Sequence, residues 1–212
     1  NEPLIIRKSE ITIGLLNYVT EDTNPNLPKD SKVSLNYFNL EKAIKDIRKL
    51  KSKVNHIVLL MHWGGNVEDG LYPDLEQPQI ARQLIDEGAD LIIGHHSHTL
   101  QPYEVYKKKY IFYSLGNFCF ADIYFEGKKI EIQQGKHTES FLVTIDFYSD
   151  SYSVNLIPVV NEKLFIKKRD NILKKISKRN WYFQKVLRSK LVWNIYYWKL
   201  KHWDPKMFYL FG

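Results

Sequence analysis

The sequence predicts an α/β fold, because short apolar segments alternate with segments of helical periodicity over its first hundred residues. Ile11–Tyr18, His56–His62 and Ala89–Ile93 are short and aliphatic, which is typical of strands buried on both faces of a parallel sheet. A helical segment separates each of them from the next. The resulting order of strand, helix, strand, helix and strand is typical of an α/β unit.

Both helices have recognisable ends. The first is expected to begin after Asn39 as its cap and to run to about Lys51. The second is expected over Asp74–Glu87, where Pro78 suits the first turn and Gly88 suits the left-handed position just past the end. One apolar face of the first helix repeats at spacings of three and four residues: Leu40, Ala43, Ile44, Ile47 and Leu50.

The pattern changes after the third strand, where two hairpins are expected. Tyr103–Tyr106 and Tyr110–Ser114 flank three consecutive lysines, and Glu139–Phe147 and Tyr152–Val160 flank a short polar turn. These pairs would add antiparallel strands to the α/β unit.

Length and composition are those of one packed domain with an extension. The chain has 212 residues, of which 44% are hydrophobic, and its single cysteine, Cys119, excludes an intramolecular disulfide. It starts at Asn1 without a signal peptide, and no apolar run approaches the roughly 20 residues of a membrane span. We interpret the chain as a piece of a longer protein, so the missing targeting signal indicates nothing about location.

The net charge of +7 is unevenly distributed. Residues 161–212 hold 14 Lys and Arg against 3 Asp and Glu, whereas the rest of the chain holds 17 against 21. This asymmetry predicts a domain over residues 1–160 and a basic extension over residues 161–212, helical around Asp170–Arg188.

The extension holds four of the five tryptophans, which alternate with Lys and Arg: Trp181, Trp193, Trp198 and Trp203. Three interpretations stay open. The helix packs its aromatic residues on the domain, it makes a peripheral contact with an anionic membrane, or it binds an acidic polymer such as polyglutamate, teichoic acid or nucleic acid. Specific nucleic-acid binding ranks last, since no recognised binding motif accompanies the charge.

Four histidines follow two of the predicted strands. His62 ends one strand, and His95, His96 and His98 follow the next. Ligands of α/β sheets collect at the carboxyl ends of the strands, so these side chains are expected to converge. In extended chain His96 and His98 would point the same way, and neutral imidazole suits zinc, iron, nickel and, with oxygen ligands, manganese. The alternative is a set of partly buried polar residues at strand ends.

Four blocks of sequence in this region resemble the CapA family, within the calcineurin-like metallophosphoesterase superfamily. The blocks are residues 61–64 (MHWG), 79–90 (QIARQLIDEGAD), 91–98 (LIIGHHSH) and 113–118 (YSLGNF), and a weaker likeness extends from about Pro3 to Val160. The resemblance implies a metallophosphoesterase-like αββα sandwich, here partial with its N-terminal half missing, followed by the basic helical extension.

For the site, the resemblance implies a two-metal centre that uses divalent ions such as Mn, Zn or Fe. His62, His96 and His98 are carried over as metal ligands, and His95 and Asn117 as candidate catalytic residues. His95 could instead be a ligand, a support for a ligand or a phosphate contact. Asn117, like Ser114 near it, could belong to an ordinary turn.

Other residues near these motifs have weaker assignments. An acidic role for Glu68 or Asp69, just after the His-Trp-Gly block, is left open. The three remaining histidines are interpreted as ordinary ones: His56, His137 and His202.

The superfamily's early motifs, which supply an aspartate and a histidine, a bridging aspartate or glutamate, and an asparagine–histidine pair, are not found, and we expect the chain to begin after them. Two divalent ions about 3.5–4 Å apart need a bridging carboxylate. The isolated chain is therefore expected to be a poor hydrolase, although three histidines could still hold one zinc weakly.

Three functions follow from these expectations. The first is capsule or poly-γ-glutamate biosynthesis, the second is phosphoester hydrolysis unrelated to capsule, and the third is a non-catalytic scaffold of the cell envelope. The implied partner is an anionic polymer or a phosphoester substrate, and the implied location is the bacterial cell envelope or its membrane.

Overall fold

The computed structural model describes residues 2–23, 27–131, 134–185 and 189–203. Its main element is a six-stranded sheet with four parallel strands in the centre and an antiparallel strand at each edge. In spatial order the strands are β1 (Leu4–Lys8), β2 (Ile11–Val19), β3 (His56–His62), β4 (Leu91–His95), β6 (Lys109–Phe112) and β5 (Tyr103–Tyr106).

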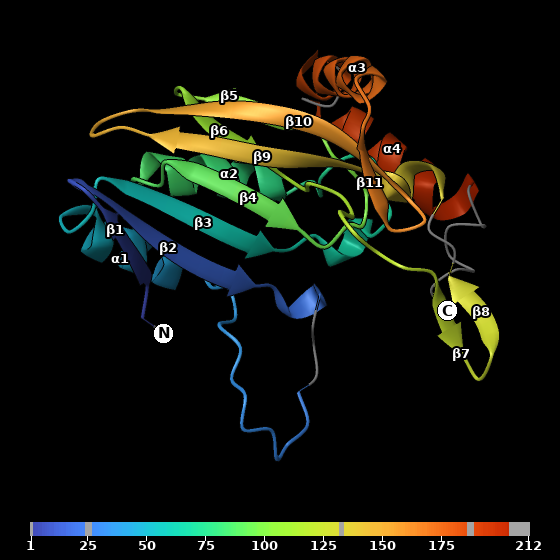
Figure 1. Cartoon of the computed structure of the whole chain (residues 1–212), viewed down its shortest axis with the longest axis horizontal. Coiled ribbons are helices and arrows are strands. Elements are labelled where there is room, and N and C mark those ends of the chain that lie inside the picture. The colour runs from blue at the N-terminus through green and yellow to red at the C-terminus, as the bar shows by residue number, and fades with distance from the viewer. Residues whose placement is uncertain (1, 24–26, 132–133, 186–188, 204–212) are drawn as a thin grey trace.

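A second, antiparallel sheet packs on one face of the first (Figure 1). It contains β9 (Glu139–Phe147), β10 (Tyr152–Glu162) and β11 (Phe165–Lys168). Val58, Leu91 and Phe112 of the first sheet are buried in this interface, against side chains such as Val143 and Val154. Alternate residues of each central strand therefore face opposite layers, as period-two alternation requires.

The other face of the first sheet is covered by α1 (Leu40–Lys51) and α2 (Gln77–Asp86). Asn39 caps α1, because its side chain accepts a hydrogen bond from Lys42 N at 3.0 Å. α2 begins at Gln77 rather than at Asp74, since Asp74 N donates to Gln77 Oε1 at 2.5 Å in a turn before the helix. Burial of Ile47 and Leu84 against Leu59 forms the main core.

The predicted α/β class is confirmed, and so are both predicted hairpins. The described residues form a helical layer and two sheet layers of the implied sandwich, while the outer face of β9–β10 stays exposed at Leu142, Thr144 and Asn155. The sequence did not indicate β1, β11 or the separate hairpin of β7 (Ile123–Phe125) and β8 (Lys128–Glu131).

The basic extension, predicted to be helical, begins with the end of β10 and with β11, and continues as α3 (Asn171–Lys185) and α4 (Lys190–Trp203). Ile172 and Ile176 pack with Leu100, and Phe183 and Trp193 join the main core. Strand β10 crosses the proposed boundary at residue 160, so the division into two units stays a prediction.

None of the helices in the described part of the chain is both long enough and apolar enough to cross a bilayer.

Candidate metal centre

The strand register brings His62 and His95 to the same edge of the sheet. β3 and β4 are parallel neighbours, and His62 is the register partner of His95. Thr20, just after β2, adds to this edge because its N–H donates to His62 O at 2.9 Å. We call His62, His95, His96 and His98 the histidine rim; it lies at the carboxyl ends of the parallel strands, as the sequence predicted.

Gly94 and Trp63 fix the ends of these strands. A Cβ atom on Gly94 would lie 2.0 Å from the carbonyl oxygen of Tyr113, so only glycine fits there. Trp63 is 2% exposed and donates from Nε1 to the same Tyr113 oxygen at 3.0 Å. Its N–H also donates to His95 O at 3.3 Å. The backbone that carries the rim is therefore held by buried hydrogen bonds.

Beyond His95 the chain turns instead of continuing in extended form. His96 has φ +108° and His98 has φ +56°, both in the region that L residues rarely adopt. The expectation that extended chain aligns these two side chains is therefore wrong. The turn itself brings the rings together, with centroids 4.8 Å apart for His62 and His96 and 6.1 Å apart for His96 and His98. Backbone strain of this kind is common at functional sites.

His62 and His96 form the closest pair of nitrogen atoms in the rim. His62 Nε2 lies 3.1 Å from His96 Nδ1. Two nitrogens bound to one zinc at about 2.0–2.1 Å would lie roughly 3.0–3.4 Å apart, so this pair fits one ion. Among the described residues, the buried Nε2 of His96 has no hydrogen-bond partner. An ion held through Nδ1 would leave this Nε2 protonated and still without a partner, so the support for the ion comes from the facing nitrogens alone.

Three rim histidines, His62, His95 and His96, favour neutral imidazole, the form that binds metal ions. Burial, and then the charges of His62 and His98, lower the pKa of His96 to about 4. Burial also lowers the pKa of His62, with His98 adding to the effect and Asp22 opposing it. His95 lies at the surface, yet nearby segments of the same chain partly desolvate its ring. This desolvation lowers the pKa of His95, and the charge of His62 lowers it further.

His98 is oriented by Asn117, which is 3% exposed. His98 Nδ1 lies 2.9 Å from the amide oxygen of Asn117, and with that oxygen as acceptor the Nδ1 atom carries the proton. In the neutral form of the ring Nε2 then keeps its lone pair, and this atom lies 3.7 Å from Glu68 Oε1. Asn117 thus contacts a rim histidine, while the catalytic roles of Asn117 and His95 stay predictions.

Three further residues belong to this region. Asp22 accepts a hydrogen bond from Gly65 N at 2.9 Å and acts electrostatically on the rim. Asp69 is 2% exposed and its Oδ1 lies 3.2 Å from His137 Nδ1, although the sequence suggested an ordinary role for His137. Asp69 stands near the His-Trp-Gly block, but no motif marks Asp22 or His137, and only the fold brings them here.

The ligand set inferred from sequence is only partly assembled. Within the described ranges, no group of three or more His, Cys, Asp or Glu side chains converges closely enough to hold a metal ion. The structure pairs His62 with His96 and directs His98 towards Glu68. The metal-ligand roles of His62, His96 and His98 together stay a prediction.

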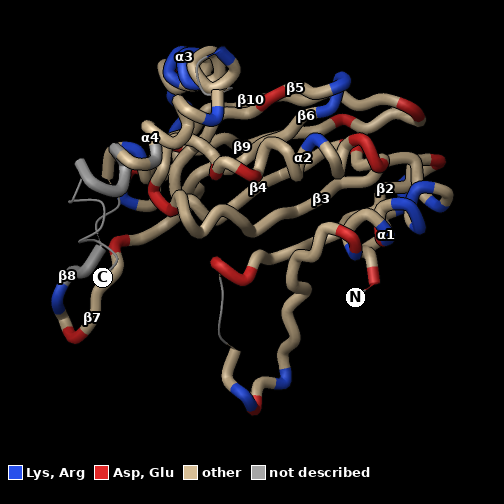
Figure 2. The backbone as a smooth tube through the Cα atoms, turned by 180° about the vertical axis from the view of Figure 1, so that it is seen from behind, with Lys and Arg blue, Asp and Glu red and all other residues tan. Residues whose placement is uncertain are grey.

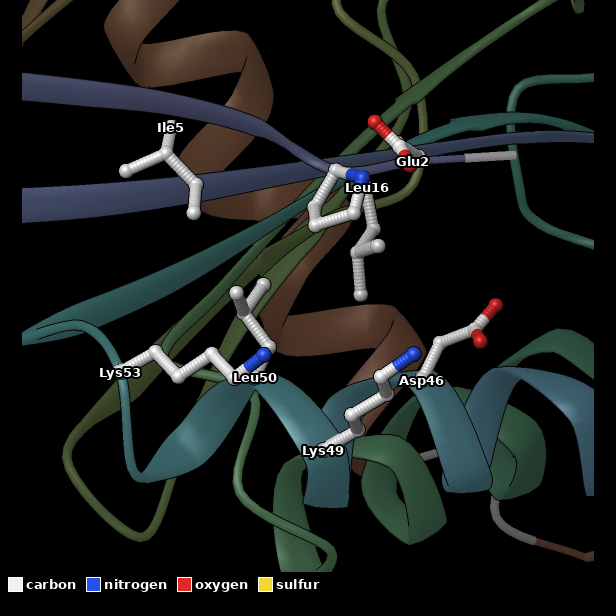
Figure 3. A pocket seen from close by; sticks show the side chains of 8 residues that line it. Glu2, Ile5, Leu16, Asp46, Lys49, Leu50 and Lys53 are labelled. Atoms are coloured by element: carbon white, nitrogen blue, oxygen red, sulfur yellow. The ribbon is translucent and has the colours of Figure 1, made fainter.

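A separate cavity of about 250 Å³ lies between the β1 edge of the sheet and α1 (Figure 3). Ile5, Leu16 and Leu50 give it an apolar wall, and Asp46 and Lys49 lie among its charged residues. No rim histidine lines it, so it has no part in the metal chemistry considered for the rim.

Comparison with known proteins points to one family. Residues 1–122 match the family described as bacterial capsule synthesis protein PGA_cap. The PGA biosynthesis protein CapA of Bacillus subtilis (strain 168) is 33% identical over 153 residues, covering 70% of this chain and 38% of that protein. The capsule biosynthesis protein CapA of Bacillus anthracis is 44% identical over 70 residues, covering 33% of this chain and 16% of that protein. The chain thus spans well under half the length of either relative.

Two solved structures align with this chain at low scores. The sulfate thiohydrolase SoxB of Thermus thermophilus aligns with a TM-score of 0.44 and 14% identity, over 86% of this chain and 29% of that one. The NAD nucleotidase NadN of Haemophilus influenzae aligns with a TM-score of 0.40 and 16% identity, over 84% and 36%. These scores are too low to support an assignment, which rests on the sequence matches. Because the family match covers more than half of its 212 residues, the chain belongs to the bacterial capsule synthesis protein PGA_cap family.

Proposed function

We propose that this chain supplies the histidine-bearing part of a divalent-metal centre in a protein of capsule or poly-γ-glutamate synthesis. Family membership supports the biological role, since two relatives are named for PGA and capsule biosynthesis. Because the chain covers only 38% of the Bacillus subtilis relative, the activity of the whole protein is part of the proposal.

One observation carries the metal centre. His62 Nε2 and His96 Nδ1 come from the ends of two neighbouring strands and meet at 3.1 Å. A hydrogen bond between the two rings would use the lone pair of only one of the two facing nitrogens. One ion at the rim would use the lone pairs of both facing nitrogens.

The residues of the chain have distinct roles in this proposal. His62 and His96 hold the ion, and Asn117 orients His98 so that its Nε2 lone pair stays available. The charge of Asp22 favours a cation near His62 and His96. When bound, Mn, Zn or Fe would polarise an oxygen of the substrate and lower the pKa of a bound water molecule.

The substrate is proposed to be a phosphoester or an anionic polymer, because both present oxygen anions to a cation. Phosphoester hydrolysis unrelated to capsule is the second candidate. A non-catalytic scaffold is the third, and it is favoured by the lack of a converged three-ligand group among the described residues. Measurements of metal binding and of polymer production distinguish these three candidate functions.

Metal binding by the chain is the direct test. Zinc and manganese are titrated into metal-free protein by calorimetry, with His96→Ala as the variant. The matched control is His56→Gln at the opposite end of β3, where His56 Nε2 contacts Tyr148 O. We expect His96→Ala to weaken binding at least about 10-fold and His56→Gln to leave it unchanged. Equal binding by all three proteins would remove the metal centre.

The biological role is tested in the host. The gene encoding the chain is deleted and then restored either intact or as His96→Ala, and the secreted polymer is measured. Loss of polymer on deletion, rescued by the intact gene but not by the variant, supports metal-dependent synthesis. Rescue by both would favour the scaffold, and no loss on deletion would favour a hydrolase outside capsule synthesis.

A further inference from the structure

We propose that the outer face of α3 binds the surface of an anionic lipid bilayer. This face, called the α3 outer face below, consists of Leu173, Lys174, Ser177, Lys178 and Trp181, which line a shallow groove of about 580 Å³. Their spacing of three and four residues places them on one side of the helix. The proposal is independent of the metal centre.

The orientation of α3 is fixed by its opposite side. Ile172, Ile176 and Phe183 are 1%, 2% and 5% exposed. Arg179 donates from Nη1 to Leu100 O at 2.8 Å, and the side-chain oxygen of Asn180 accepts from Tyr103 N at 3.0 Å. These contacts lock the inner face onto the segment that follows the histidine rim, so the outer face must point to solvent.

The charge of α3 and α4 is entirely of one sign. Residues 171–203 contain nine Lys and Arg and no Asp or Glu, and Figure 2 shows the concentration of positive charge along α3. Lys175 is neutralised by an ion pair with Glu139. The ion pairs identified in the described residues do not include Lys174 or Lys178, so these two lysines present their charge outward.

Apolar side chains accompany this charge on the same face. Trp181 is 60% exposed and Leu173 is 40% exposed, on either side of the two lysines along the helix. A soluble polyanion would be bound by the lysines alone and would leave both apolar side chains in water. A bilayer satisfies both, since Trp and Leu enter the interface while Lys meets the acidic headgroups. A second copy of the chain is disfavoured, because two α3 outer faces would repel one another.

Vesicle co-sedimentation of the 212-residue chain tests the proposal. Vesicles of phosphatidylglycerol and phosphatidylcholine are compared with pure phosphatidylcholine at low and high salt. The variant is Lys174→Gln/Lys178→Gln, and the matched control is Lys45→Gln/Lys49→Gln, two exposed lysines at the same spacing on α1. Thermal unfolding of both variants establishes that they fold.

We expect binding to the anionic vesicles only, weakened by high salt and about 30-fold by Lys174→Gln/Lys178→Gln, at roughly fivefold per lysine. Adding Trp181→Ala to the lysine variant should weaken vesicle binding further. Trp181→Phe in its place should restore part of that loss. The control should bind like the parent chain.

Each other outcome overturns the proposal. An equal loss of vesicle binding in the α1 control would show that only the net charge of the chain matters. Equal binding by all variants would show that a surface other than the α3 outer face contacts the vesicles. Retention on immobilised polyglutamate without vesicle binding would assign the α3 outer face to a polymer.

Discussion

The histidine rim and the α3 outer face differ in how the fold determines their chemistry. The rim rings are placed by strand register and by a turn with two residues of positive φ. The rings of His62 and His96 therefore lie close together, with centroids 4.8 Å apart. The α3 outer face is placed by the buried half of one helix, and its own side chains contact mainly water. The rim should thus be sensitive to small changes in backbone, and the outer face only to changes in charge and polarity.

Gly94→Ala should have the largest effect on the rim. The added methyl group would lie 2.0 Å from Tyr113 O and 2.5 Å from Trp63 Nε1, so β4 and β6 would have to separate. We expect the free energy of unfolding to fall by about 4 kcal/mol or more, measured by denaturant unfolding.

Gly127→Ala is the control for this change. Gly127 has φ +75° but nothing within 4 Å of its added Cβ, so only the backbone conformation is penalised, by about 1–2 kcal/mol. Similar losses at both glycines would show that crowding at the rim is not the constraint described here.

Phe183→Ala and Trp181→Ala compare how the buried and the exposed face of α3 contribute to stability. Phe183 is 5% exposed and packs edge-on against Tyr113, with ring centroids 5.4 Å apart, whereas Trp181 is 60% exposed. Phe183→Ala should lower the free energy of unfolding by about 3 kcal/mol and Trp181→Ala by less than about 0.5 kcal/mol. Equal losses in urea titrations would contradict the assignment of inner and outer faces.

Much of this architecture could be predicted because it has local signals. Buried parallel strands are short aliphatic runs, and the cap Asn39 and the left-handed Gly88 mark helix ends directly in the sequence. β1 was missed because Leu4, Ile5 and Ile6 are exposed at a sheet edge and show no alternation. The hairpin β7–β8 is short and lies apart from both sheets (Figure 1).

The site was predictable in part for the same reason. Register carries His62 and His95 together once two neighbouring parallel strands are assumed. The positive φ of His96 has no sequence signal, and the turn is joined to a distant segment by a hydrogen bond in which Ser97 O accepts from Asp69 N at 2.9 Å. Likewise, the approach of His137 to Asp69 spans 68 positions and depends on tertiary structure alone.

Acid should destabilise the metal-free chain because His96 is protonated more readily in the unfolded state, and this effect should be smaller than that of Phe183→Ala. The pKa of His96 falls from 6.5 to about 4 on folding, so between these values the unfolded chain binds more protons than the folded one. Stability should be constant above about pH 6.5, fall by about 1–2 kcal/mol towards pH 4 after allowance for partial exposure, and then level off. His96→Gln should reduce this slope in urea titrations at successive pH values.

The smallest effect is expected for catalysis by the chain alone. The described residues contain no converged group of three or more metal-binding side chains, and two ions in one site need a bridging carboxylate that neutral imidazoles cannot replace. With p-nitrophenyl phosphate and excess manganese or zinc, turnover should stay within about 10-fold of the metal-only background and be the same for His96→Ala, because one weakly held ion provides little of the usual acceleration. Rapid turnover that is lost in His96→Ala but kept in His56→Gln would show that the rim is a complete active site, and that its ligand geometry closes when the ion binds.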